Sequence, residues 1–425
     1  MKPIKILLAI AIISTVSNAD SLSSLFGSLK HHYKMQIDSL SLKNANMAED
    51  LVRSQLYPKI NLYGSATHYS LPNALRPITP SETASRKKQH LPSLFSKDIN
   101  RIGVNLSMPV FVKSIYTLAN SAKYMQYSAM VKKRLDLIKD EATLLGSVAN
   151  LTYLEQMKNT LTQKKYTLRS TLKVVGSMVK SGRAAVAQKI KVEDGINKLN
   201  IAINNIMIQK ANIKSLIQSL TGVNLKHSVR IRKIGRINHG SMLALKPLRF
   251  RAKSDYLKME SEKEKRLPSL FLKANYTKSY GEGYISKKSV DSDFSSISIN
   301  FKMPILDASL QKSTEISILH YLKSNIEILK TKNELEAQAK ALKMQLGLLR
   351  GNMRFGKKDI MQQKRLLKIA KSTFESQRMP IEEYLRYIDS LYEAKADYYK
   401  IKAVYWQTFA KLAFIYGNDL SKILK

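Results

Sequence analysis

Residues whose types and spacing could support chemistry are scarce in this chain of 425 residues. Cysteine is absent, and the seven histidines, which include the adjacent His31 and His32, have no carboxylate partners at the spacing of metal ligands. The sequence also lacks a phosphate-binding glycine loop, an HExxH helix and a nucleophile elbow. We therefore expect no enzyme, no cofactor and no metal centre.

One group of charged side chains follows a proline near the end of the chain. Glu382 and Glu383 come just after Pro380, and Arg386 lies one helical turn further on. On a helix, Glu383 and Arg386 are neighbours at i and i+3, a spacing that gives surface ion pairs worth about a few tenths of a kcal/mol. A structural ion pair is one interpretation of this group. A functional interpretation depends on the elements that position these side chains.

The first residues have the pattern of an export signal. Lys2 and Lys5 precede the apolar run 6–13, and small residues follow at 17–19, so we expect a signal peptide over 1–19. The run is shorter than the ~20 residues that span a bilayer as a helix. Without cysteine, an exported chain has neither a disulfide framework nor a cysteine-linked lipid anchor.

The net charge of +39, from 71 Lys and Arg against 32 Asp and Glu, raises the question of nucleic acid as a partner. The basic residues are spread along the chain instead of forming one patch, and export separates the protein from cytosolic DNA and RNA. We therefore expect no nucleic-acid partner. Solvated helix faces near an anionic surface that bears lipopolysaccharide account better for the charge.

The same module occurs twice in the chain. Three pairs of residues are each 195 residues apart: Pro109 and Pro304, Arg183 and Arg378, and Gly222 and Gly417. One constant offset indicates an internal duplication aligned without a gap. We place the first repeat at 20–222 and the second at 243–425, joined by a linker or equatorial segment over 223–242.

Each repeat is predicted to contain a β-hairpin, over about 57–111 and about 268–305. Apolar and polar residues alternate along 296–304 with the period of a strand, so that Ile297, Ile299, Phe301 and Met303 lie on one face. That face suits lipid and the opposite face suits water. We expect a long, polar, proline-bearing loop over 71–97 in the first hairpin and a shorter loop in the second, both on an exposed surface.

Long helices are predicted after each hairpin, over about 112–180 and 306–376, because neither stretch contains proline and Leu or Ile recurs every seven residues. Such helices are on the order of 100 Å long. Tight turns over about 181–187 and 376–381, with a glycine or a proline at the equivalent place in the two halves, lead into shorter helices. We also expect one helix before each hairpin, the first over about 21–56.

Four strands can cross a bilayer, since ~9–11 tilted residues suffice, but they cannot close a barrel. An open sheet edge in lipid leaves backbone groups unpaired, so the chain must oligomerise. Two copies would give a narrow, plugged barrel, and three copies would supply twelve strands around an open lumen.

The ordered, duplicated set of proline-bearing strand starts at Pro58 and Pro268, Met-Pro strand ends, hairpin turns and terminal glycines resembles the TolC family of outer-membrane efflux proteins over nearly all of the mature chain. The resemblance implies an α plus transmembrane β-barrel fold: a homotrimer with a twelve-stranded barrel in the outer membrane and an α-helical tunnel in the periplasm. It implies a passive exit duct for small molecules such as drugs, toxic compounds and metal ions. Its partners would be a periplasmic membrane-fusion adaptor, an inner-membrane pump of RND or ABC type, and outer-membrane lipid and lipopolysaccharide.

The resemblance also implies a gate at the periplasmic end. The first position of the family's acidic ring falls on Glu383, beside Glu382, whereas the second falls on Arg386, which departs from the family pattern. Three copies of Glu383 would then meet on the axis and attract cations, with Arg386 or Arg378 offsetting them in the closed state.

The two hairpin tips would dock the adaptor. The implied docking residues are Ser181, Gly182, Arg183, Ala184 and Val186 in the first tip, and Gln377, Arg378, Met379, Pro380 and Ile381 in the second. An aromatic girdle is expected from the tyrosines beside the strands, which are Tyr57, Tyr63, Tyr69, Tyr276 and Tyr280.

Two other functions stay open. A type I protein secretion duct would use the same chain with a different pump. A soluble periplasmic coiled-coil scaffold would not need the apolar face that alternation along 297–303 predicts.

Overall fold

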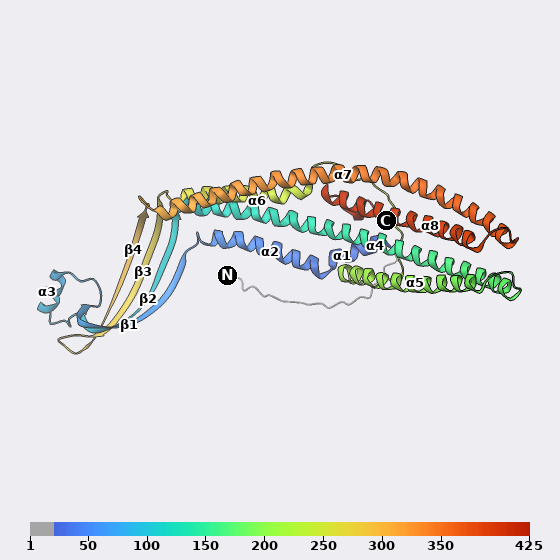
Figure 1. Cartoon of the computed structure of the whole chain (residues 1–425). Helices are drawn as coiled ribbons and strands as arrows, with labels where there is room; N and C mark the ends of the chain where they lie inside the picture. The colour runs from blue at the N-terminus through green and yellow to red at the C-terminus, as the bar shows by residue number, and fades with distance from the viewer. Residues whose placement is uncertain (1–20) are drawn as a thin grey trace. The chain divides into compact units, whose positions relative to one another are not determined.

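The computed structural model describes residues 21–425 (Figure 1), so the predicted signal peptide lies outside the described residues. The chain divides into two compact units, and each takes segments from both repeats. The helical unit contains 21–41, 130–247 and 329–425, and the sheet unit contains 42–129 and 248–328. Within the described part of the chain, no helix is both long and apolar enough to cross a membrane.

The sheet unit contains four antiparallel strands in the order β1-β2-β3-β4. Their bounds are β1 Lys59–Ala74, β2 Phe95–Phe111, β3 Ser269–Glu282 and β4 Ser289–Lys302. The two hairpins are joined directly, because β2 of the first repeat pairs with β3 of the second. β1 and β4 are the edge strands of this sheet.

The pairing register makes the sheet apolar on one face and polar on the other. Ile60, Leu106, Ala274 and Ile297 pair in turn across the four strands, and the adjacent row consists of Asn61, Asn105, Asn275 and Ser296. Successive residues of a strand point to opposite faces, so these rows belong to different faces. Apolar side chains of β4 are open to their surroundings in the single chain: Ile297 and Ile299 are 79% and 74% exposed.

The loop predicted over 71–97 is shorter than expected and contains a helix. β1 continues to Ala74, and a short helix, α3 Pro80–Lys88, precedes β2. The Thr79 side chain caps this helix by accepting a hydrogen bond from the Glu82 N–H, at 3.2 Å. Pro80 occupies the first turn, where its missing N–H has no cost, so the proline starts a helix instead of excluding one.

Tyrosines do not form one girdle along the strands. Tyr63 lies over Gly103, where an added Cβ would meet its ring at 2.8 Å, and its hydroxyl bonds Thr277 on the polar face. The Tyr69 hydroxyl accepts a hydrogen bond from Arg101, a residue of that same face. The girdle prediction is therefore wrong for Tyr63 and Tyr69.

Serine contacts join the helices of the sheet unit. The buried Ser121 hydroxyl of α4 donates to the Ser254 carbonyl of α6 at 2.8 Å, and Ser261 donates to the Ser114 carbonyl at 2.7 Å. α6 spans Lys246–Glu264. These small side chains let two helix backbones approach closely while every buried hydroxyl keeps a partner.

Two helical hairpins make up most of the helical unit (Figure 1). The first consists of α4 Lys113–Lys180 and α5 Val186–Thr221, and the second of α7 Ala308–Glu375 and α8 Ile381–Ile415. Their shared core contains the predicted seven-residue repeat of α4, which is Leu154, Leu161, Leu168 and Val175. On α7, by contrast, the buried apolar residues are Ala339, Leu346, Ala370 and Phe374, and the predicted repeat, Ile328, Leu335, Leu342 and Leu349, is only half-buried.

The single helix expected over 21–56 is broken. α1 Leu22–His31 and α2 Tyr33–Ser54 are separated by His32, whose ψ of 154° is extended. Four apolar side chains of α1 are buried in the helical unit: Leu22, Leu25, Phe26 and Leu29. Burial of these side chains, which recur at each turn, fixes the direction of α1. α2 has a single buried residue, Met35.

Candidate functional site at the hairpin tips

The two tips have the same backbone geometry. Gly182 has φ 72° and Gln377, at the equivalent position, has φ 60°. In both tips the next residue donates its N–H to a carbonyl five residues earlier, Arg183 to Met178 at 2.8 Å and Arg378 to Thr373 at 3.0 Å. This left-handed C-cap with its long-range bond is the Schellman motif, which satisfies the last carbonyls of α4 and α7.

The glycine and the proline of the two tips are not equivalent, contrary to our prediction. Gln377 takes the left-handed position of Gly182, and Pro380 corresponds to Ala185, the residue before α5. Ala185 and Pro380 are both extended, with ψ of 145° and 148°. Left-handed geometry is therefore required in both tips, although only one supplies the glycine that adopts it without strain.

The predicted docking residues differ in exposure. Ser181, Gly182 and Arg183 are exposed, and Val186 is 61% exposed. In the second tip Gln377, Arg378 and Pro380 are exposed, whereas Ala184 of the first tip and Met379 are half-buried. Ile381 is only 4% exposed and belongs to the core with Tyr384 and Ile388. Ile381 therefore anchors α8 and does not lie on the surface of the tip.

Glu382, and not Glu383, holds the ion pair at this end of α8. The Lys191 ammonium of α5 lies 3.2 Å from the Glu382 carboxylate. The pKa of Glu382 is lowered by a hydrogen bond from its own backbone N–H and by Lys191, with Arg386 adding to the effect. Among the ion pairs of residues 21–425, none joins Glu383 to Arg386, so the predicted pair is wrong.

Lys191 is the charged residue that sequence reasoning missed. It lies 195 residues before Arg386, so the duplication places one cation at the same position in both hairpins. Both cations act on Glu382. The repeat offset could have identified Lys191, but its contact with Glu382 depends on how α5 and α8 pack.

Further polar contacts tie α8 to α4. The Lys164 ammonium lies 2.6 Å from the Asp389 carboxylate, and the Thr167 and Tyr392 hydroxyls are 3.1 Å apart. Phe374 of α7 stacks on Tyr384 with ring centroids 4.7 Å apart. The first part of α8 is thus held to α4 and α7 by charge, hydrogen bonding and aromatic packing together.

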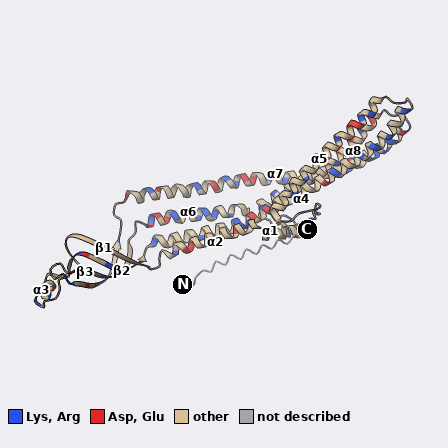
Figure 2. Cartoon of the chain, turned by 90° about the horizontal axis from the view of Figure 1, so that it is seen from below, with Lys and Arg blue, Asp and Glu red and all other residues tan. Residues whose placement is uncertain are grey.

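Basic residues are distributed along the helices, as Figure 2 shows for α5, α6, α7 and α8. Several line one groove of about 790 Å³ between α4 and α7, namely Lys364, Arg365, Lys368 and Lys371. Burial and the charge of Lys364 lower the pKa of Lys395. No cluster of three or more His, Asp or Glu side chains in residues 21–425 is arranged to hold a metal ion.

A buried acid lies near the C-terminal segment and was not predicted. Glu141 of α4 is 0% exposed, and its Oε2 accepts the Leu420 N–H at 2.8 Å. Burial and the nearby Asp419 raise the pKa of Glu141 to about 7. Its equivalent in the second repeat, Glu336, is exposed and pairs with Lys332 at 3.8 Å.

No protein-family model matches the sequence, and no curated protein matches it significantly. Solved structures do match. The outer membrane protein VceC of Vibrio cholerae has a TM-score of 0.77 at 13% identity, over 93% of this chain and 96% of VceC. The Campylobacter jejuni CmeC outer membrane channel has a TM-score of 0.79 at 15% identity, over 94% and 86%. The open state of the Neisseria gonorrhoeae MtrE outer membrane channel has a TM-score of 0.70 at 13% identity, over 94% and 89%. The chain therefore has the fold of the TolC family of outer-membrane channels.

Proposed function

We propose that this protein is the outer-membrane exit duct of a tripartite efflux system. Three copies would form a twelve-stranded barrel in the outer membrane and an α-helical tunnel in the periplasm. Small molecules would pass through it from an inner-membrane pump and a periplasmic adaptor to the outside, with no energy supplied by the duct itself. The observation that carries this proposal is an open amphipathic sheet in a chain with the fold of solved outer membrane channels.

The sheet supports a barrel made from several copies. Its strands have 14 to 17 residues, which exceeds the ~9–11 needed to cross a bilayer. The apolar face suits lipid, and the polar row through Asn61, Asn105 and Asn275 suits a water-filled lumen. The edge strands β1 and β4 cannot remain open in lipid, because each unpaired backbone group costs several kcal/mol. Pairing β4 with β1 of the next copy would close the ring.

Apolar helix surfaces support the same assembly. Along α7, exposed apolar residues recur every three or four positions: Ile316, Leu319, Leu322 and Ile326. α2 exposes a similar series, Ile37, Leu40, Met47 and Leu51. Surfaces of this kind on a folded chain are normally covered by a partner. Neighbouring copies of the chain would cover them in a trimer.

The tips would meet the adaptor, and the charged residues beside them would form the gate. The exposed first tip ends in Val186 and Ile190, which are 61% and 57% exposed and suit an apolar contact. The gate residues would be Glu382, Glu383, Arg378 and Arg386, with Lys191 added. Around the axis of a trimer, three copies of this group would place carboxylates and cations close together, so its opening would respond to ionic strength.

Single-channel conductance of the purified full-length protein in a planar bilayer would test the proposal, with the mass in detergent measured alongside. A trimer with discrete, long-lived openings of small conductance is the expected result. A monomeric or dimeric mass without channel openings would overturn the duct and favour a periplasmic scaffold. Cell fractionation gives an independent check, since the duct must appear with the outer membrane.

A further inference from the structure

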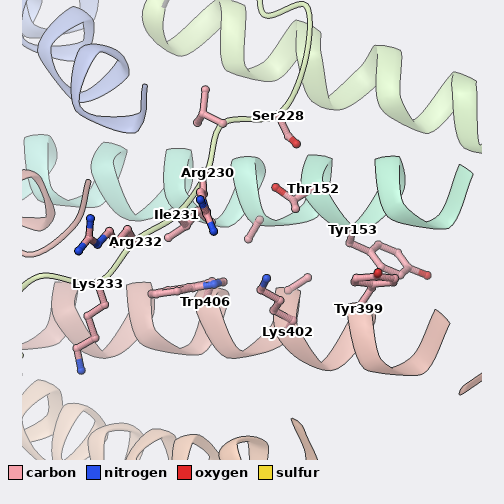
Figure 3. Close-up of a pocket in the computed structure, with 13 residues that line it drawn as sticks. Thr152, Tyr153, Ser228, Arg230, Ile231, Arg232, Lys233, Tyr399, Lys402 and Trp406 are labelled. Atoms are coloured by element: carbon pink, nitrogen blue, oxygen red, sulfur yellow. The ribbon is translucent and has the colours of Figure 1, made fainter. Parts of the chain in front are cut away.

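A cavity of about 860 Å³ lies between α4, α8 and the extended segment Ser228–Lys233, which we call the strap (Figure 3). The whole cavity belongs to the helical unit. Of the 13 residues that line it, all in the described part of the chain, four are basic and none is acidic. The basic residues are Arg230, Arg232, Lys233 and Lys402. This volume is typical of small-molecule sites, which occupy roughly 300–1,000 Å³.

The strap is fixed at both ends. At one end Ser228 donates its hydroxyl to the Glu155 carboxylate at 2.6 Å, and its backbone N–H also donates to that carboxylate. Burial alone would raise the pKa of Glu155, but these bonds and Lys210 lower it, so the carboxylate stays ionised. At the other end, Arg232 exchanges backbone hydrogen bonds with Lys425, at 2.7 and 2.9 Å. This wall of the cavity is therefore preformed in the ligand-free chain.

Apolar residues hold the strap against the helices. Val229 and Ile231 pack in or against the apolar core, whereas Arg230 and Arg232 are exposed. Figure 3 shows the Arg230 side chain directed toward α8, which carries Lys402 and Trp406. The guanidinium of Arg230 is therefore open to a ligand that enters the cavity.

The cations of the cavity have no acidic partners. Within residues 21–425, Arg230, Arg232 and Lys402 take part in no ion pair or side-chain hydrogen bond. Of the acids nearby, Glu155 is already held by Ser228 and Lys210, and Asp397 lies close enough to help raise the pKa of Tyr153. Uncompensated like charges around a partly enclosed space concentrate anions there.

The remaining wall is aromatic. Tyr153 of α4 and Tyr399 and Trp406 of α8 line the cavity. Trp406 packs edge-on against Tyr405 and Phe409, with ring centroids 5.2 and 5.7 Å apart, which holds its indole in place. A flat apolar group can stack on these rings.

We propose that this cavity binds a small organic anion that carries a flat ring. Its carboxylate or phosphate groups would lie against Arg230 and Lys402, with the guanidinium able to bind them in a bidentate manner. Its ring would stack on Trp406 and Tyr399. The proposal does not depend on the duct function, because the site is complete within one chain.

The chain contains a reporter for this site, since Trp406 is its only tryptophan. The probe is benzene-1,3,5-tricarboxylate, titrated into the purified full-length protein while Trp406 fluorescence and binding heat are recorded. We expect a saturable fluorescence change, and none with the uncharged tricarboxamide. Arg230→Gln and Lys402→Gln should each weaken binding about tenfold, which corresponds to about 1.4 kcal/mol.

Two control variants separate the cavity from the general positive charge. Arg236→Gln and Lys400→Gln remove the same charge from neighbouring positions that do not line the cavity, and both should bind as the wild type does. Equal weakening by these controls, or equal binding of the tricarboxamide, would overturn the proposal. So would the absence of a saturable change by both readouts. Circular dichroism checks folding, which should persist because the replaced side chains are exposed and unpaired in the described chain.

Discussion

The chain leaves α4 through Gly182 and leaves α7 through Gln377, with nearly the same φ, and makes the same two hydrogen-bond patterns in both turns. The residues that follow are different. The first turn of α5 has no acidic residue, whereas α8 begins with Glu382 and Glu383. Backbone geometry has been retained through the duplication while the charge of one tip has changed. The two tips of one chain can therefore share a shape and still bind different groups.

The buried Glu141 and the exposed Glu336 make the same point in the middle of the long helices. They occupy equivalent positions, but only Glu141 is covered by the C-terminal segment. Its carboxylate accepts a hydrogen bond from the Leu420 N–H of that segment. The environment of each carboxyl here therefore depends on the segment that packs beside it and not on its place in the repeat. Four experiments test this comparison of the two repeats.

The largest effect is expected from Gly182→Val. A β-branched residue at φ 72° is strained, so the first turn should rearrange and export should be lost while the trimer level stays unchanged. The matched control is Gly182→Gln, which copies the second tip and has open space for its side chain. Drug sensitivity of cells that depend on the protein, with trimer level on gels, is the measurement. Parallel loss of trimer and export would show that the tip is not the affected part.

The second effect is a pH dependence through Glu141. Its pKa rises from 4.5 to about 7 on folding, which at 1.36 kcal/mol per unit corresponds to about 3 kcal/mol. Below pH 4.5 the carboxyl is protonated in both states. Between pH 4.5 and about 7 the unfolded chain ionises first, so stability falls as pH rises and then levels off.

Glu141→Gln keeps an acceptor for Leu420 but cannot ionise, so it should remove this loss of stability. The thermal midpoint at pH 5 and at pH 8 measures it, and the exposed Glu336→Gln is the matched control with no expected change. A similar pH dependence in wild type and Glu141→Gln would contradict the assignment.

Gln377→Gly tests the strain in the second tip. Relief of the left-handed side chain should raise the free energy of unfolding by up to about 1 kcal/mol, reduced by the added freedom of glycine in the unfolded chain. The measurement is the thermal midpoint of the purified protein. Gly182→Gln should show the opposite sign, and a change of the same sign in both would contradict equivalence of the two positions.

The smallest effect is expected from the charges around Glu382. Its pair with Lys191 is largely exposed, so Lys191→Ala should cost about 0.2–1 kcal/mol and less at high salt. Arg386→Ala should change stability less, because Arg386 is the weaker influence on Glu382. A double-mutant cycle with Glu382→Gln measures each coupling, and a stronger coupling to Arg386 than to Lys191 would contradict this order.

Local patterns were enough to predict much of this fold. The seven-residue spacing of Leu154 and Leu161 and the constant offset between Gly222 and Gly417 are both visible in the sequence alone, and the structure places Leu154 in the core and both glycines in left-handed caps. α3 was not predicted, although its start has two recognisable signals, Thr79 as the cap and Pro80 in the first turn.

Contacts between distant segments could not be predicted in this way. Glu382 meets Lys191 across 191 residues, and Glu141 meets Leu420 across 279. Both contacts depend on which helices pack side by side. The spacing of residues within one segment does not predict this packing. The same limit applies to the strap, whose arginines reach their cavity only because α4 and α8 lie beneath it.

The sheet continues across the duplication because β2 pairs with β3. A ring of three copies would also contain six helical hairpins of two chemical kinds, three with glycine-containing tips and three with acidic ones. Such a ring has approximate sixfold symmetry in its backbone and threefold symmetry in its charge. A ligand that contacts only the backbone of the tips would have six binding sites in such a ring, whereas a ligand that contacts Glu382 would have three.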